Sequence, residues 1–266
     1  MELFGYFACL FIGITLGLIG SGGAILTVPI LVYLFHIKPE HATGYSLFIV
    51  GFTSGIGAIR HYFMGNLQLK TAVYFVVPST TMLLFTRKYI LPNIPDQLVQ
   101  IGSFNCTKDL LLLILFSVLM IFASISMIRK SAEPIENQKV NPFQLSVIGF
   151  IVGCVSGLLG AGGGFLIIPS LLFFGKLSMK QAVGTSLLII TTATLLGFAG
   201  DVLQGRSFDY TLLAKITALA LAGLLLGTQL SKKMNSAQLK PIFGWFILSM
   251  GIYIIIKSVF FSNLMQ

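Results

Sequence analysis

Gly17-Leu-Ile-Gly20-Ser-Gly-Gly-Ala24 is a glycine-rich break inside apolar sequence, and it recurs as Gly157-Leu-Leu-Gly160-Ala-Gly-Gly-Gly164. Each copy is followed by a short apolar run that contains a proline, Pro29 or Pro169. The two copies stay in the same register, without a gap, as far as the pair Gly57 and Gly197. Self-similarity at a fixed offset predicts two structurally related halves. A glycine break repeated within apolar segments points to a transporter whose site lies between those halves.

The composition places the chain in a membrane. Of its 266 residues, 56% are hydrophobic and only 9% are charged, and the mean hydropathy is +0.94. A soluble domain carries about 25% charged residues. Because only a helix satisfies all of its own backbone groups in lipid, each apolar segment is predicted to be helical. We therefore expect an all-α, polytopic integral membrane protein, with no room beside its helices for a soluble catalytic domain.

The net charge of +9 does not indicate nucleic acid as a partner. The basic residues stand at the ends of apolar segments, as at Arg87 and Lys88, and form no patch interleaved with aromatic residues. The preference of Lys and Arg for the cytoplasmic side explains this placement. A weaker interpretation is that the positive charge attracts anions to the mouths of a pore.

Ten apolar segments can be drawn, five in each half. They cover residues 3–20, 24–35, 42–59, 69–86, 110–128, 143–160, 164–175, 182–200, 211–230 and 241–261. The second segment of each half is short: twelve helical residues rise about 18 Å, against roughly 30 Å of hydrocarbon. With the preceding helix, each is expected to form a re-entrant or broken hairpin that turns at the glycines. The stretch 87–109, with its two prolines, is interpreted as a loop with an interfacial turn.

The chain divides at its most polar stretch. Residues 1–128 form the first repeat, 129–142 a polar linker, and 143–266 the second repeat. If each short segment returns the chain to the side it came from, the halves are inverted relative to each other. The excess of Lys and Arg then makes the linker cytoplasmic and both termini external. If each short segment instead completes a bent span, the halves are parallel and this assignment fails.

The glycine breaks are the first candidate site. A helix that begins after a break presents unpaired N–H groups with partial positive charge. Two such amino ends meeting near the midplane would bind an anion without a formal charge. The candidate donors are Ser21, Gly22, Gly23, Ala24, Ala161, Gly162, Gly163 and Gly164. The alternative is that these glycines serve only close helix packing.

Two further groups complete the candidate residues. Ser46 and Ser186 occupy equivalent positions, and their hydroxyls can replace water around an oxyanion; the alternative is that they bond to carbonyls of their own helices. Arg60, His61 and Asp201 are candidates for gating or coupling, and Asp201 occupies the position equivalent to His61. These three lie near predicted segment ends, where reaching to the interface is the alternative role.

An enzymatic function finds little support in the sequence. The chain contains no His-Glu-x-x-His metal site and no Walker A lysine, and the glycines at 160–164 lack the strand and downstream acid of a dinucleotide loop. The three cysteines have neither the spacing of a metal site nor that of a disulfide framework. We expect a non-enzyme without metal or cofactor.

The paired motifs resemble the TauE/SafE family of membrane transporters. The resemblance rests on Gly-Leu-Ile-Gly-Ser-Gly-Gly-Ala-x-Leu-x-Val-Pro, on Ala42-Thr-Gly-x-Ser46-Leu, and on the second copy with Gly162 to Gly164, Pro169 and Ala182-Val-Gly-Thr-Ser186-Leu. It covers essentially the whole chain, and it implies movement of small sulfur-containing anions across the bacterial inner membrane. The first copy departs from the second at Ser21 and Ala24.

These observations predict a multi-pass secondary transporter of the cell inner membrane that moves a small anion by alternating access. A sulfur oxyanion or an organosulfonate is the expected solute, and Gly163→Leu is expected to block transport without preventing insertion. Its partners are that solute and the lipid bilayer, with a homo-oligomer left open. The alternatives are a non-transporting membrane scaffold or assembly factor on the same fold, and a passive anion channel.

Overall fold

The computed structural model of the chain describes residues 2–20, 22–95, 97–101, 104–128, 141–159, 164–233 and 236–262. The helices of the first half are α1 (Glu2–Ile19), α2 (Gly22–Tyr33), α3 (Pro39–Phe63), α4 (Leu69–Phe85), the π-helical turn η1 (Thr86–Ile90), α5 (Leu91–Asn93) and α6 (Lys108–Ile128). Those of the second half are α7 (Pro142–Leu159), α8 (Gly164–Phe173), α9 (Met179–Leu203), α10 (Tyr210–Lys233) and α11 (Ser236–Ser262). The prediction of a helical, polytopic membrane protein is confirmed.

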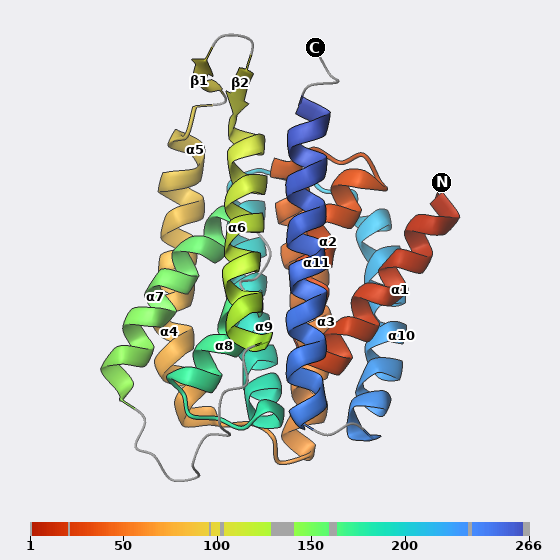
Figure 1. Cartoon of the computed structure of the whole chain (residues 1–266), viewed down its shortest axis with the longest axis vertical. Helices are drawn as coiled ribbons and strands as arrows, with labels where there is room; N and C mark the ends of the chain where they lie inside the picture. Colours follow the sequence, from red (N-terminus) through yellow and green to blue (C-terminus); the bar gives the residue numbers. More distant parts are fainter. Residues whose placement is uncertain are drawn as a thin grey trace.

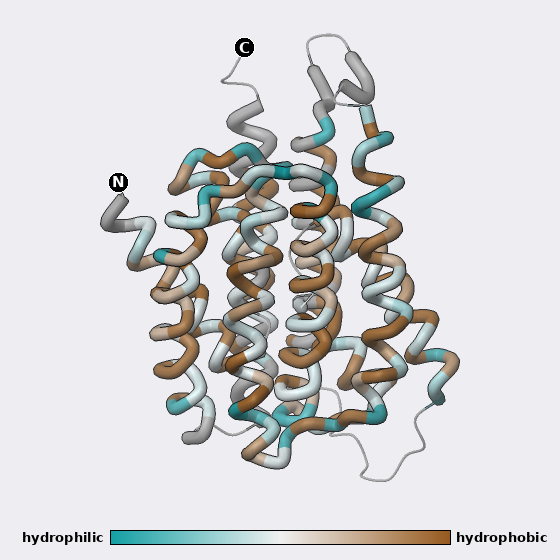
Figure 2. The backbone as a smooth tube through the Cα atoms, turned by 180° about the vertical axis from the view of Figure 1, so that it is seen from behind, coloured by the Kyte–Doolittle hydropathy of each residue, from teal (hydrophilic) through white to brown (hydrophobic). Residues whose placement is uncertain are grey.

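The helices have the length and surface that a bilayer requires. Five of them, in the described part of the chain, are long and apolar enough to cross a membrane. Large apolar side chains stay exposed on the outside of the bundle, among them Phe7, Phe63, Phe122, Phe143 and Trp245. Figure 2 shows hydrophobic colour along the helices and much of the hydrophilic colour at the two ends of the bundle. Lipid therefore replaces water around the middle of the molecule.

One prediction about the first half is wrong. Residues 87–109 were expected to form a loop, but the helix of α4 continues through η1 and α5 as far as Asn93. Two short antiparallel strands follow, β1 (Gln97–Ile101) and β2 (Phe104–Thr107). Pro92 is the next-to-last residue of this continuous helix, so the backbone hydrogen bond that its missing N–H removes affects only the final turn.

The short helices turn back within the bundle. α1 enters from the end that holds both termini, and α2 returns toward that end; α7 enters from the end where α6 stops, and α8 returns toward it (Figure 1). The two helices α2 and α8 contact each other. This course is that of the predicted re-entrant hairpins, and it supports the inverted rather than the parallel arrangement of the halves.

The packing partners also pair reciprocally between the halves. α1 lies along α10, α4 along α7, α3 along α9, and α6 along α11. Exchanging the two halves leaves this set of pairs unchanged. Of the five candidate spans, α3 and α9 are the most deeply enclosed: 72% and 61% of their most apolar stretch is buried, against 39–44% for the other three. The pair α3/α9 therefore forms the centre of the molecule.

Glycines let the outer pairs approach closely. A Cβ at Gly17 of α1 would lie 2.5 Å from the carbonyl oxygen of Leu224 on α10, and a Cβ at Gly223 of α10 would collide with the carbonyl of Leu10. On the other side of the bundle, a Cβ at Gly153 of α7 would collide with the backbone of Ser79 on α4. Small residues at these contacts bring the backbones together, as is common between membrane helices.

Backbone features recur at equivalent positions of the two halves. His36 and Lys176 both have φ of 53°, and Gly65 and Gly205 have φ of 72° and 80°. The turn after α3 closes with a hydrogen bond from Asn66 N–H to the His61 carbonyl, and the turn after α9 closes in the same way from Arg206 to Asp201. The internal repeat stays a prediction, and these recurrences support it.

Candidate functional site

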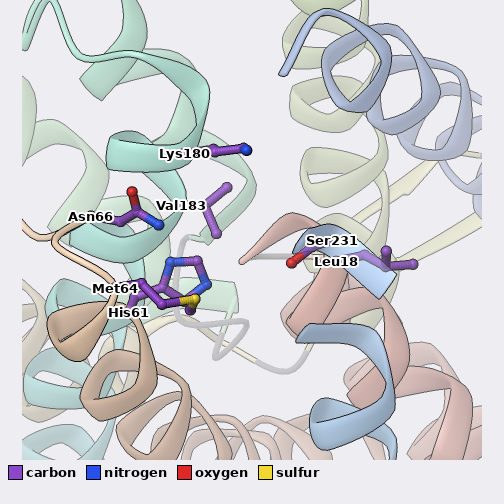
Figure 3. Close-up of a pocket in the computed structure, with 7 residues that line it drawn as sticks. All are labelled: Leu18, His61, Met64, Asn66, Lys180, Val183 and Ser231. Atoms are coloured by element: carbon purple, nitrogen blue, oxygen red, sulfur yellow. The ribbon is translucent and has the colours of Figure 1, made fainter. Parts of the chain in front are cut away.

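A cavity of about 120 Å³ lies at one end of the α3/α9 pair. Seven residues line it: Leu18, His61, Met64, Asn66, Lys180, Val183 and Ser231. Figure 3 shows Asn66, His61 and Met64 on one side of this space and Leu18 and Ser231 on the other. The lining comes from α1, the end of α3 and its turn, α9 and α10, so both halves contribute. A space of this volume holds several waters or one small solute.

The lining is rich in donors and carries positive charge. Lys180 supplies a cation, and Asn66 and His61 supply groups that can donate hydrogen bonds, whereas the Ser231 hydroxyl donates to the Thr228 carbonyl at 3.1 Å. No carboxylate is among the described residues that line the cavity. The arrangement suits an anion better than a cation, because a cation would meet Lys180 without a carboxylate to balance it.

The first glycine break borders this cavity. Gly20 has φ of 80°, and a Cβ there would lie 2.7 Å from Cγ1 of Val183 in the cavity wall. Ser21, a predicted donor, lies outside the described residues. Gly22 begins α2, and nothing is described of the side chain of Ala24. Gly23 serves packing, since a Cβ there would lie 2.5 Å from the Ile12 carbonyl oxygen.

The second break approaches α9 from its other end. Ala161, Gly162 and Gly163 lie outside the described residues, and Gly164 is the buried first residue of α8. Before the break, the carbonyl of Gly157 accepts a hydrogen bond of 3.3 Å from Nη1 of Arg87, which binds Asp201.

The residues that precede the two breaks, Gly20 and Gly157, lie toward opposite ends of α9, whereas the helices that follow the breaks, α2 and α8, contact each other. Val183 and Asp201 stand eighteen residues apart on α9, which corresponds to about 27 Å of helix. The meeting of the two amino ends near the midplane stays a prediction, because most of the donors lie outside the described residues.

The two equivalent serines differ in their bonding. Both are fully buried. Ser186 donates to the Val183 carbonyl at 2.8 Å, as the simpler alternative predicted. The hydroxyl of Ser46 finds no hydrogen-bond partner in the part of the chain that the structure describes, and neither does that of Ser54, two helical turns further along α3. A buried hydroxyl without a partner is costly, so Ser46 remains a candidate to bind a solute or water, and the structure adds Ser54.

Arg60 and His61 have different surroundings. Nη1 of Arg60 donates to the Thr228 hydroxyl of α10 at 2.6 Å, which holds α3 against α10. His61 is buried and lines the cavity. A gating role for either residue stays a prediction.

Asp201 takes part in a buried ion pair that the sequence did not reveal. Nε of Arg87 donates to Oδ1 of Asp201 at 2.8 Å, and Nη2 of Arg87 pairs with Oδ2. Both side chains are almost completely buried. The interpretation of Arg87 as a basic residue in an interfacial loop is therefore wrong. Its partner lies 114 residues away in the chain, so no local sequence pattern could have indicated the pair.

Three more charged residues surround this pair. Arg206 approaches Asp201 at 3.8 Å and Glu40 at 3.6 Å, and Lys108 approaches Glu40 at 3.9 Å. We call the residues Glu40, Arg87, Lys108, Asp201 and Arg206 the ion cluster. It lies at the end of the α3/α9 pair opposite the cavity, because α9 begins beside the cavity at Met179 and ends at Leu203. Among the described residues, no group of three or more His, Cys, Asp or Glu side chains is placed to hold a metal.

Comparison with known proteins identifies the family. The family described as Sulfite exporter TauE/SafE matches residues 6–254. The chain belongs to the TauE/SafE family. It is 30% identical over 258 residues to a probable membrane transporter protein of Xylella fastidiosa (strain 9a5c), covering 93% of this chain and 92% of that protein. It is also 30% identical to the probable membrane transporter protein YdhB of Bacillus subtilis (strain 168) over 229 residues, 86% of this chain and 90% of the relative.

A more distant relative is the probable membrane transporter protein MJ0441 of Methanocaldococcus jannaschii, with 26% identity over 92% of each chain. No solved structure matches this chain. The TauE/SafE chain described here is thus a multi-pass membrane transporter of that kind, with its bundle enclosing the helix pair α3/α9.

Proposed function

We propose that this transporter moves a small oxyanion, of the sulfite or organosulfonate class, by alternating access. The observation that carries the proposal is the cavity at the His61 end, whose described lining has a lysine and several donors and no carboxylate. Its volume of about 120 Å³ suits a compact solute. The family description, Sulfite exporter TauE/SafE, supports a sulfur oxyanion.

Alternating access accounts for the difference between the two ends of α3/α9. One end holds a cavity, whereas the other is filled by the ion cluster. A carrier caught in one of its two states has this appearance. With the orientation that the Lys and Arg residues predict, the cavity faces the cytoplasm.

Uptake into proteoliposomes tests the solute class. Purified protein is reconstituted and offered sulfite, thiosulfate, sulfoacetate and taurine, and Lys180→Gln is compared with Lys70→Gln. Lys70 is an exposed lysine at the same end of the bundle that does not line the cavity. We expect saturable uptake of one or more of the anions, with KM raised about tenfold in Lys180→Gln, because a charged hydrogen bond is lost, and unchanged in Lys70→Gln.

Other outcomes would favour other functions. Equal effects of the two lysine variants would contradict the assignment of the cavity as the anion site. Flux that does not saturate would favour the passive channel, and no flux of any solute would favour the scaffold or assembly factor.

A further inference from the structure

Aromatic side chains close the end of the α3/α9 pair that carries the ion cluster. The ring of Phe208 packs at 5.3 Å from that of Tyr45 and at 4.9 Å from that of Phe198, and Phe198 packs at 5.0 Å from Phe48. A Cβ at Gly44 would lie 2.7 Å from Phe208 and 3.2 Å from the Asp201 carboxylate. No space for a solute is left between α3 and α9 at this contact.

The ion cluster joins the two halves across this end. Glu40, Arg87 and Lys108 come from the first half, and Asp201 and Arg206 come from the second. The central pair, Arg87 with Asp201, is buried. Separating a buried pair leaves two uncompensated charges, so this end opens only when both charges gain water or new partners.

The other end of α3/α9 lacks these closing groups at the equivalent positions. In the register that pairs Gly57 with Gly197, Glu40 corresponds to Lys180, Asp201 to His61, and Arg206 to Asn66. The carboxylates of the ion cluster are thus replaced by a lysine and a histidine, which cannot form the same ion pairs.

The aromatic residues are replaced as well. Phe208 corresponds to Gln68, Phe198 to Ala58, and Phe48 to Leu188. The cavity is found at the end where these smaller side chains stand. The two ends therefore differ because different residues occupy equivalent positions in the two halves, and not because the backbone fold differs.

We propose that the ion cluster, backed by the aromatic residues around Phe208, is a gate of the transport path, closed in this state. Opening it separates Glu40 and Arg87 of the first half from Arg206 and Asp201 of the second. Among the described residues, the cavity end has no matching cluster of ion pairs, so the resting molecule is open there. This inference rests on the proposed alternating access and does not depend on which anion is carried.

Cysteine accessibility tests the gate without a known solute. The three native cysteines are replaced, and a single cysteine is placed either at Leu18, in the cavity lining, or at Thr43, which is buried beside Gly44. A membrane-impermeant thiol reagent is applied to vesicles of each orientation. We expect the labelling rate of Leu18→Cys, with reagent on the cavity side, to be about tenfold higher than that of Thr43→Cys with reagent on the opposite side.

The gate is then weakened in the same two backgrounds. Glu40→Gln removes the carboxylate that Arg206 and Lys108 share, and Arg206→Gln is the second variant should the first fold poorly. Glu40 and Arg206 are both partly exposed, which favours folding. Either change should raise the labelling rate of Thr43→Cys several-fold and lower that of Leu18→Cys. Lys215→Gln, which removes an exposed charge on α10 that belongs neither to the cavity lining nor to the ion cluster, should change neither rate.

The outcomes separate this inference from the proposed function. If both gate variants leave the labelling of Thr43→Cys as slow as before, the gate is overturned, whatever solute is transported. If the labelling shifts as expected but no anion is taken up by proteoliposomes, the gate holds and the proposed solute class is wrong.

Discussion

At the scale of single residues, the most consequential contact is one that joins distant parts of the chain. The sequence singled out Asp201 because it ends an apolar segment at the position equivalent to His61. It could not supply the partner, since Arg87 looks like any basic residue at a segment end and lies 114 residues away. Local patterns reveal an unusual charge in a membrane segment, but only the fold reveals what neutralises it.

Removing one member of this pair should destabilise the protein. Arg87→Met leaves the Asp201 carboxylate buried without its main partner, and we expect a loss of about 3–5 kcal/mol in the free energy of unfolding. The double variant Arg87→Met, Asp201→Leu should recover most of that loss, because an apolar pair of similar volume needs no hydration. Thermal unfolding in detergent measures both. Equal damage in the single and the double variant would contradict the account.

The two equivalent serines should respond differently to alanine. Ser46→Ala removes a buried hydroxyl that has no partner among the described residues, so stability should stay the same or rise by about 1 kcal/mol. If that hydroxyl binds the solute, KM for uptake should rise. Ser186→Ala removes a hydroxyl already bonded to its own helix, and KM should not change. If KM instead rose for Ser186→Ala and not for Ser46→Ala, the hydroxyl that binds the solute would lie on α9 and not on α3.

At the scale of helices and their contacts, the sequence predicted most of what the structure has. The ten apolar segments correspond to the described helices within a few residues, and the half-length segments 24–35 and 164–175 correspond to α2 and α8. The extension through η1 and α5 and the β1/β2 hairpin were missed. Prolines in that stretch suggested a loop, but Pro92 stands only one residue before the continuous helix ends at Asn93, where a missing N–H affects the final turn alone.

The glycine contacts between outer helices allow a direct test. In α10, Gly223 faces the backbone of α1, whereas its neighbour Ala222 is exposed on the outside of the bundle. Gly223→Leu should force α1 and α10 apart and cost about 1–3 kcal/mol or more of stability. Ala222→Leu adds similar bulk toward lipid and should leave the melting temperature nearly unchanged. Size-exclusion profiles and melting temperatures compare the two, and equal tolerance would argue against close packing at Gly223.

At the scale of the whole molecule, the repeat suggested two related halves around a shared path. The reciprocal pairing of helices and the turns repeated at equivalent positions support that suggestion. The sequence did not indicate that the ends of the path differ. That difference arises from different residues at equivalent positions, such as Glu40 against Lys180 and Phe208 against Gln68. Their effect could be recognised only once the fold showed that equivalent positions lie at opposite ends of α3/α9.

The central claim is that this chain carries a small oxyanion by exposing one site alternately to the two sides of the membrane. Exchange in proteoliposomes tests it most directly: labelled sulfite or sulfoacetate is added outside, with or without the same unlabelled anion inside. A carrier that alternates between two states predicts that internal anion accelerates the uptake of label several-fold and that the rate saturates. Uptake that is indifferent to internal anion and linear in concentration, or no uptake of any anion, would contradict it.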